Sequence, residues 1–259
     1  MWDPTVYHRY GSERSRPFVD LLARVGAEHP RAVVDLGCGS GELTETLAGR
    51  WPGARIAGLD SSPEMIAEAG ARGTGVEFHL GDLAHWRPGP DTDVVITNAA
   101  LQWVPGHDEL LTRWARALPP GAWLALQVPG NFDAPSHRML RELARSALYA
   151  ATLGEVVREA PVDDAAGYAA RLVAEGASVD AWETTYVHLL PATGDDHPVL
   201  RWMEGTALRP VKAALGDTAW RVFRADLGAK LAAVYPARSG KVAFPFRRIF
   251  VVAQVQEEK

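Results

Sequence analysis

The sequence contains a single cysteine, Cys38, among its 259 residues. One cysteine excludes an internal disulfide and is typical of proteins that fold in a reducing compartment. The net charge of −5 argues against a general affinity for nucleic acid. No apolar run approaches the length of about 20 residues that spans a bilayer, and no basic segment leads into an apolar one at the N-terminus. We therefore expect a cytoplasmic protein with neither a membrane partner nor a nucleic-acid partner.

The sequence also lacks the residue spacings of several common catalytic sites. None of the eight histidines has another histidine three or four residues away, so no helix-borne metal site is expected. Gly240-Lys241 is followed by valine, which excludes a P-loop, and Ser40 does not lie in a hydrolase elbow. Flexible linkers, low-complexity tracts and internal repeats are absent as well. A chain of this length and 47% hydrophobic content is expected to form a single domain, residues 1–259.

The most informative stretch is residues 33–44, where a β-branched apolar run leads into Asp35 and then into Gly37, Gly39 and Gly41. Glycine allows a tight turn with positive φ and lets the backbone approach a ligand closely. The helical pattern that follows leaves free N–H groups at the end of this turn. The stretch predicts a strand, a loop for a nucleotide-type cofactor and a helix, at the carboxyl end of the first parallel strand. A glycine-rich turn without any ligand is the alternative.

Two classes of cofactor use such a loop. The dinucleotide fingerprint requires a third glycine where this chain has Glu42, and a carboxylate is a poor neighbour for a pyrophosphate. The same carboxylate is tolerable beside a methylsulfonium, and residues 35–41 resemble motif I of the class I S-adenosylmethionine-dependent methyltransferases. This resemblance implies a Rossmann-like α/β fold with a mostly parallel seven-stranded sheet and helices on both faces. It also implies S-adenosyl-L-methionine as the cofactor, S-adenosyl-L-homocysteine as the product, and no metal.

Further strands of the expected sheet also end in polar residues. Asp60 ends the strand 54–60, about twenty residues after the glycine loop, where Rossmann-like folds bind ribose hydroxyls; a simple helix cap is the alternative. The resemblance implies that Asp82, after the strand 76–80, binds the adenine amino group. Asn98 ends the strand 93–98 and is expected to face the sulfonium. The predicted cofactor-binding residues are Asp35, Gly37, Gly39, Gly41, Asp60, Ser61, Met65, Asp82, Leu83, Asn98 and Gln102.

The acceptor side is predicted from charge. A carboxylate acceptor is already ionised at neutral pH and needs no catalytic base, so the protein has to orient it and remove its water. Arginine binds carboxylates through two parallel hydrogen bonds and stays charged when partly buried. Arginines occur at Arg14, Arg16, Arg209 and in the Arg247-Arg248 pair, all in segments expected near the rim of the site. Each arginine taken alone is more often a solvated side chain, and Trp103 could anchor its loop in the core. The predicted substrate-positioning residues are Arg14, Arg16, Trp103, Asn131 and Arg209.

The sequence has two segments that a minimal methyltransferase fold does not need. At the N-terminus, a helix is expected to start near Pro4 and a second one at Pro17, with Phe18, Leu21 and Val25 on its apolar face. Helical patterns at 136–157 and 165–176 precede the expected strands 182–188 and 247–253, which are separated by a mostly helical insert. We expect the N-terminal lid, about 1–30, and the helical insert, about 190–245, to form a cap on the substrate side. The N-terminal helix could instead simply dock on the domain.

Segments along nearly the whole chain resemble the trans-aconitate 2-methyltransferases. They are residues 2–4, 13–17, 35–41, 59–66, 98–103, 184–186 and 205–210. This resemblance implies a carboxyl O-methyltransferase, expected to be monomeric, that forms the monomethyl ester of trans-aconitate or of a closely related small anionic tricarboxylate. The alternatives are a methyltransferase for a hydroxyl or amine acceptor and a non-catalytic cofactor-binding protein.

Overall fold

The computed structural model describes residues 11–157 and 161–256, with side chains from residue 15 onward. These residues form two compact units. We call residues 12–129, 162–184 and 248–256 the sheet unit. We call the described residues of 1–11, 130–161 and 185–247 the helical unit. Among the described helices, none is long and apolar enough to cross a bilayer.

The strands form one seven-stranded sheet in the order β3-β2-β1-β4-β5-β7-β6. Strands β1 to β5 pair in parallel, whereas β7 pairs antiparallel with β5. This confirms the predicted mostly parallel seven-stranded sheet. The strand order reverses between β1 and β4, which is where open α/β sheets bind their ligands. The strands are β1 (Ala32–Leu36), β2 (Arg55–Asp60), β3 (Glu77–Leu80), β4 (Thr92–Asn98), β5 (Trp123–Pro129), β6 (Ser178–Pro191) and β7 (Lys241–Gln254).

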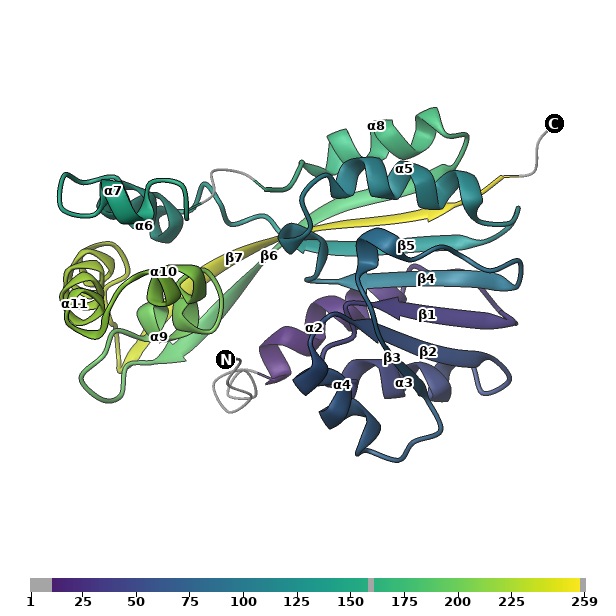
Figure 1. Cartoon of the computed structure of the whole chain (residues 1–259), viewed down its shortest axis with the longest axis horizontal. Helices are drawn as coiled ribbons and strands as arrows, with labels where there is room; N and C mark the ends of the chain where they lie inside the picture. The colour runs from purple at the N-terminus through teal and green to yellow at the C-terminus, as the bar shows by residue number, and fades with distance from the viewer. Residues whose placement is uncertain (1–10, 158–160, 257–259) are drawn as a thin grey trace. The chain divides into compact units, whose positions relative to one another are not determined.

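Helices cover both sides of the sheet within the sheet unit. Figure 1 shows α5 (His107–Ala117) and α8 (Ala165–Ala174) on one side, and α2 (Gly11–Leu22), α3 (Glu42–Arg50) and α4 (Pro63–Gly70) on the other. Trp114 of α5 is fully buried in the same core cluster as Val95 and Leu124 of the central strands. Central parallel strands are buried on both faces, which explains why β5 is almost continuously apolar and why the middle of β4, residues 94–96, is apolar as well.

The helix α2 begins earlier than the sequence predicted. It runs from Gly11 to Leu22 with Pro17 inside it, so the expected helix start at Pro17 is wrong. Proline lacks the N–H that would bond to the carbonyl four residues earlier, and this loss usually marks a helix boundary. The predicted apolar face is present, because Phe18 and Leu21 are buried on α2 and Val25 is buried just after it. The expected helix near Pro4 lies outside the described residues.

The strands β6 and β7 are longer than predicted and run through both units. On β6, Val187 and Leu189 are exposed while Tyr186, His188 and Leu190 are buried, which is the alternation of a strand with one covered face. Pro245 lies inside β7 and is exposed. Proline within a strand pattern normally argues against a strand, so the local sequence does not signal that β7 starts before Pro245.

The helical unit contains the helices of the predicted segment 136–157 and of the insert between β6 and β7, whereas the helix predicted at 165–176 is α8 of the sheet unit. Its core includes Tyr149 and Phe223, whose rings meet edge to face at 5.0 Å, and a cluster in which His188 stacks on Trp202 at 4.7 Å. Its helices are α6 (Pro135–Ala144), α7 (Ala150–Leu153), α9 (Pro198–Glu204), α10 (Arg209–Ala214) and α11 (Asp217–Val234).

Candidate functional site

The glycine loop joins β1 to α3 and is held by backbone bonds to the end of β2. The N–H groups of Gly37 and Cys38 both donate to the carbonyl of Leu59, at 2.7 and 3.1 Å. Gly37 has a φ of 81°, and a Cβ atom there would lie 2.3 Å from the Cβ of Ala100. Glycine is therefore required at this position both by the backbone conformation and by the close approach of the segment after β4.

The carboxylate of Asp60 connects the glycine loop to the start of α4. Its Oδ2 accepts from the Gly39 N–H and its Oδ1 accepts from the Ser62 N–H, both at 2.9 Å. Ser62 caps α4, because its Oγ accepts from the N–H of Met65 at 3.3 Å. Ser61, between the two, is exposed. The structure thus brings Asp60 to the tip of β2 directly beside the loop.

Asp35 lies beneath the loop as a buried carboxylic acid. Its Oδ2 accepts a hydrogen bond of 2.6 Å from the hydroxyl of Thr44 in the first turn of α3. Burial raises the pKa of Asp35 to about 6, with a smaller contribution from the nearby Asp60 charge, while the Thr44 bond acts in the opposite direction. The hydrogen bond between Asp35 and Thr44 therefore links β1 to α3 beneath the glycine loop. The sequence analysis did not identify Thr44 as part of this support.

The segment after β4 is held in an unusual backbone conformation. Ala99 has a φ of 55°, a left-handed value that costs energy for a residue with a side chain. Its N–H donates to the Gln127 carbonyl at 2.9 Å, and its own carbonyl accepts from Nε2 of Gln102 at 2.6 Å. The Oδ1 atom of Asn98 is buried and has no hydrogen-bond partner among the described residues. Backbone strain and an unused acceptor at one place are typical of a ligand site.

Asp82 and Leu83 also lie close to the loop region. Leu83 is buried, and its Cδ2 lies 3.9 Å from the position of a Cβ atom at Gly37. Asp82 is exposed, and its Oδ1 caps the short helix η1 (Leu83–His85) by accepting from the Ala84 N–H at 2.9 Å. The polar atoms of Asp82 thus face solvent while Leu83 provides an apolar surface.

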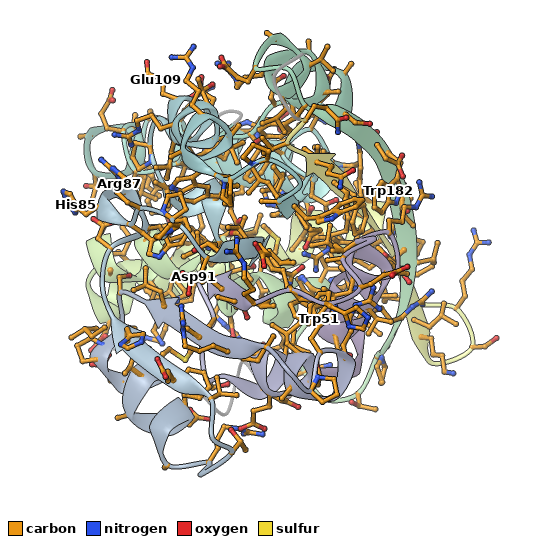
Figure 2. The ribbon with its side chains drawn as sticks, turned by 90° about the vertical axis from the view of Figure 1, so that its right-hand side faces the viewer. Trp51, His85, Arg87, Asp91, Glu109 and Trp182 are labelled. Atoms are coloured by element: carbon orange, nitrogen blue, oxygen red, sulfur yellow. The ribbon has the colours of Figure 1, made fainter. Side chains whose placement is uncertain are left out.

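The predicted cofactor residues gather at one edge of the sheet. Figure 2 looks at the opposite edge, where the parallel strands begin and where the labelled Trp51 and Asp91 belong to the connections that lead into β2 and β4. Asp91 pairs there with Arg55 at 3.0 Å. That edge contains this ion pair, whereas Asp60 and Asn98 are the last residues of their strands, and the glycine loop and Leu83 follow the carboxyl ends of theirs.

The predicted substrate residues are divided between the two units. In the sheet unit, Arg16 of α2 is exposed and Trp103 is 48% exposed, so Trp103 is not buried in the core. In the helical unit, Arg209 begins α10 and is exposed, while Asn131 is buried.

The side chain of Asn131 uses only part of its hydrogen-bonding capacity. Its Oδ1 accepts from the Arg247 N–H at 2.6 Å, but its Nδ2 is buried without a partner in the described chain. The side chain of Arg14 lies outside the described residues. The grouping of Arg14, Arg16, Trp103, Asn131 and Arg209 around an acceptor stays a prediction.

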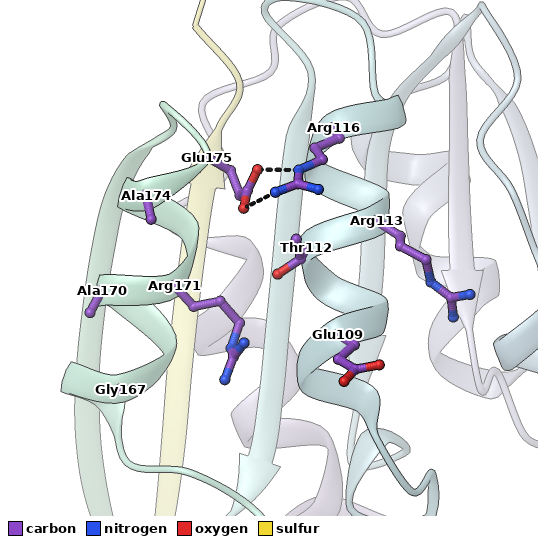
Figure 3. A pocket seen from close by; sticks show the side chains of 9 residues that line it. All are labelled: Glu109, Thr112, Arg113, Arg116, Gly167, Ala170, Arg171, Ala174 and Glu175. Carbon is purple, nitrogen blue, oxygen red and sulfur yellow. Dashed lines mark hydrogen bonds and ion pairs between the residues drawn. The ribbon is translucent and has the colours of Figure 1, made fainter.

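A groove between α5 and α8 contains none of the predicted site residues. Figure 3 shows its lining, in which Arg116 and Glu175 face each other and form a two-bond ion pair, with Nη2 to Oε1 at 2.9 Å. Arg171 pairs with Asp108 at 3.0 Å. Exposed pairs of this kind contribute little free energy. Arg116, Glu175 and Arg171 are thus engaged in ion pairs within the protein, so we assign no site to this groove. In the described residues, no cluster of side chains suited to a metal ion occurs either.

Comparison with known proteins identifies the class. Residues 33–121 match the family model of a methyltransferase domain. The YcgJ protein from Bacillus subtilis has a similar structure, with a TM-score of 0.58 at 15% identity, over 93% of this chain and 98% of that one. Phosphoethanolamine N-methyltransferase 2 from Haemonchus contortus, in complex with phosphomonomethylethanolamine and S-adenosylhomocysteine, is also similar in structure. Its TM-score is 0.56 at 16% identity, over 92% of this chain and 52% of that one. The fold and the glycine loop are those of a class I methyltransferase.

Three relatives match almost from end to end. The trans-aconitate 2-methyltransferase of Mycobacterium sp. (strain KMS) is 56% identical over 98% of this chain and 99% of its own length. The enzyme of the same name from Rhodococcus jostii (strain RHA1) is 55% identical over 99% of this chain and 100% of its own length. The one from Mycobacterium tuberculosis (strain ATCC 25177 / H37Ra) is 52% identical over 98% of this chain and 97% of its own length. The chain belongs to the trans-aconitate 2-methyltransferase family. This confirms the family resemblance and the S-adenosylmethionine-dependent class of enzyme predicted from the sequence.

Proposed function

We propose that this chain transfers a methyl group from S-adenosyl-L-methionine to one carboxylate of trans-aconitate and releases the monomethyl ester and S-adenosyl-L-homocysteine. The observation that carries the proposal is the identity of 52–56% over nearly the full length of relatives with this name. That similarity includes the helical unit as well as the glycine loop. The single cysteine and the net charge of −5 support a cytoplasmic enzyme, and we expect it to act as a monomer.

The residues around the glycine loop fit this cofactor. When bound, S-adenosyl-L-methionine supplies a methyl group made electrophilic by its positively charged sulfur. The Gly39 position has open space where a side chain would otherwise stand, so a ligand can approach the backbone there. Asp60 is suited to accept from ribose hydroxyls, and Leu83 to pack on the adenine ring. The unpartnered Oδ1 of Asn98 is suited to the electron-poor part of the ligand.

The work of the protein on the acceptor is to bind and orient it. A carboxylic acid with a pKa near 4 is ionised at neutral pH, so no side chain has to remove a proton. Correct orientation of reacting groups supplies up to about 7–11 kcal/mol of a reaction barrier. We assign this role to Arg14, Arg16, Trp103, Asn131 and Arg209, of which Asn131 has a buried amide donor free for a ligand. We further propose that the N-terminal lid and the helical insert form the cap that excludes water.

The direct test is methyl transfer by the purified protein. The wild type is expected to release thiol from S-adenosyl-L-methionine in the presence of trans-aconitate, and mass spectrometry is expected to find one methyl ester. Replacing Arg14, Arg16 or Arg209 with methionine is expected to lower kcat/KM by about 1.5–3 kcal/mol, or about 10- to 150-fold, for each arginine that contacts the acceptor.

The control for these substitutions is Arg113→Met, because Arg113 is an exposed arginine on α5 outside the proposed site. Its kcat/KM is expected to stay within twofold of the wild type. A protein that methylates a hydroxyl or amine compound, and no di- or tricarboxylate, contradicts the proposal. Unchanged kcat/KM in all three arginine variants contradicts the cationic acceptor site.

A further inference from the structure

Arg248 of β7 and Gln127 of β5 form a buried polar pair at the carboxyl end of β5. The strand register places Gln127 opposite Phe250 and Pro129 opposite Arg248, so Gln127 and Arg248 are diagonal neighbours on one face of the sheet. Gln127 is fully buried and Arg248 is 5% exposed. Nη1 of Arg248 donates to Oε1 of Gln127 at 3.3 Å.

This hydrogen bond determines which way the Gln127 amide faces. A guanidinium group has only donors, so the amide oxygen must be the atom that faces Arg248. The amide nitrogen Nε2 is therefore directed elsewhere, and it is buried without a partner in the part of the chain that the structure describes. Native proteins rarely leave a buried donor unused, because its lost contact with water is not compensated. The unused donor indicates a ligand oxygen at this position.

The pair lies beside the residues that we assign to the methyl donor. Asn98 of β4 pairs directly with Gln127, so their side chains emerge on the same face of the sheet. The strained Ala99 donates its N–H to the backbone carbonyl of Gln127. Ligands of open α/β sheets bind past the carboxyl ends of the strands near the order reversal. A ligand that reaches Nε2 of Gln127 is therefore next to the donor site.

The chemistry of the pair matches a carboxylate. Arg248 is followed on β7 by residues 249–253, which are all apolar and buried, so its guanidinium places a positive charge at the end of an apolar stretch. A guanidinium and an amide NH₂ offer several donors and a positive charge to one anionic group. A carboxylate whose lone pairs are engaged in this way is a weak nucleophile, so it is an anchor and not the group that receives the methyl.

We propose that Arg248 and Gln127 bind a second carboxylate of the acceptor, one that is not methylated. This inference rests on the proposed function, because it assumes an acceptor with more than one carboxylate. The pair holds the acceptor at the edge of the donor site and leaves another carboxylate to face the methyl group.

The first experiment compares the wild type with Arg248→Met on two acceptors. With trans-aconitate, we expect kcat/KM to fall about 10- to 100-fold, mainly through KM. With crotonate, which has a single carboxylate, we expect the two proteins to agree within twofold. The dissociation constant for S-adenosyl-L-homocysteine, measured by calorimetry, is expected to change less than twofold. Arg113→Met serves again as the charge-matched control.

Three other results of this experiment would contradict the inference. Equal losses on both acceptors indicate a structural role for Arg248. A large loss in S-adenosyl-L-homocysteine affinity, with the KM for trans-aconitate unchanged, assigns the pair to the carboxylate of the methyl donor. No loss on either acceptor shows that Arg248 contacts no ligand.

A second variant covers the case in which Arg248→Met does not fold. Gln127→Glu keeps the size of the side chain and strengthens its pairing with Arg248, so the thermal midpoint is expected to stay the same or rise. It also replaces an anion-binding NH₂ with a negative charge, so trans-aconitate is expected to bind at least 10-fold more weakly. Unchanged binding by this variant overturns the inference.

Failure of the proposed function is distinguishable from failure of this inference. If the wild type methylates no carboxylate, calorimetric binding of trans-aconitate to the protein saturated with S-adenosyl-L-homocysteine still tests the pair. If the wild type binds trans-aconitate and Gln127→Glu binds it more weakly, the pair binds a carboxylate even though no methyl transfer is observed. An absence of binding by the wild type refutes both.

Discussion

The bond between Thr44 and Asp35 allows a quantitative test of how the glycine loop is supported. Asp35 is 3% exposed, and its pKa is raised from 3.8 to about 6. A native pKa above the unfolded one means that folding favours the protonated acid. The stability that this group contributes is present below about pH 4 and is lost as the pH rises through 6. This rise in the pKa of Asp35 corresponds to about 3 kcal/mol of unfolding free energy, which the folded protein has lost by pH 8.

The hydroxyl of Thr44 limits this loss, since it donates at 2.6 Å to the ionised carboxylate. Hydrogen bonds to charged groups contribute about 1.5–3 kcal/mol. Thr44→Val keeps the shape of the side chain and removes the donor. We expect it to lower the free energy of unfolding by about 2 kcal/mol at pH 8, and by about 1 kcal/mol or less at pH 5, where Asp35 is mostly protonated.

The assay is urea unfolding followed by circular dichroism at both pH values. Thr46→Val is the matched control, because Thr46 lies on the same helix, is exposed, and donates to a backbone carbonyl. Its effect is expected to stay below about 0.5 kcal/mol and to be independent of pH. An equal effect of Thr44→Val at pH 5 and pH 8, or an effect of Thr46→Val of the same size, refutes the assigned ionisation of Asp35.

Two further predictions concern the glycine loop and the contact between α5 and α8. Gly37→Ala forces a methyl group to within 2.3 Å of the Ala100 side chain in a left-handed conformation, so calorimetry is expected to show at least about 10-fold weaker binding of S-adenosyl-L-homocysteine. Gly49→Ala, in open space on α3, is the control and is expected to bind normally. Tyr168→Phe removes the hydroxyl that lies 2.6 Å from Nε2 of the buried His107 and is expected to destabilise the protein by about 1–3 kcal/mol in thermal unfolding. A loss below about 0.5 kcal/mol contradicts a stabilising role for this hydrogen bond.

The conformation of the glycine loop and its neighbours could be predicted from the sequence because the signals for it are local. A strand, three glycines, a helix and an acid at the end of the next strand all lie within one short stretch, and the structure places Asp60 beside Gly39 as the spacing required. The helix cap at Ser62 follows from its neighbours in the same way. Local sequence determines such features, since each depends on backbone conformation within a few residues.

The parts that sequence reasoning missed depend on distant pairing or on tertiary context. Gln127 and Arg248 are separated by 121 positions, and nothing in either neighbourhood signals that they meet. The positive φ of Ala99 is imposed by bonds to Gln127 and Gln102, in a residue type that normally avoids it. Pro17 lies within α2 although its local preference favours a helix boundary.

The strands β6 and β7 continue without a break on either side of the insert that contains α9, α10 and α11. Because the insert begins and ends on this one pair of strands, its length and composition can change while every hydrogen-bonded strand of the sheet keeps its neighbours. Residues 192–240 can therefore be lengthened, shortened or replaced without disturbing the strand order of the sheet.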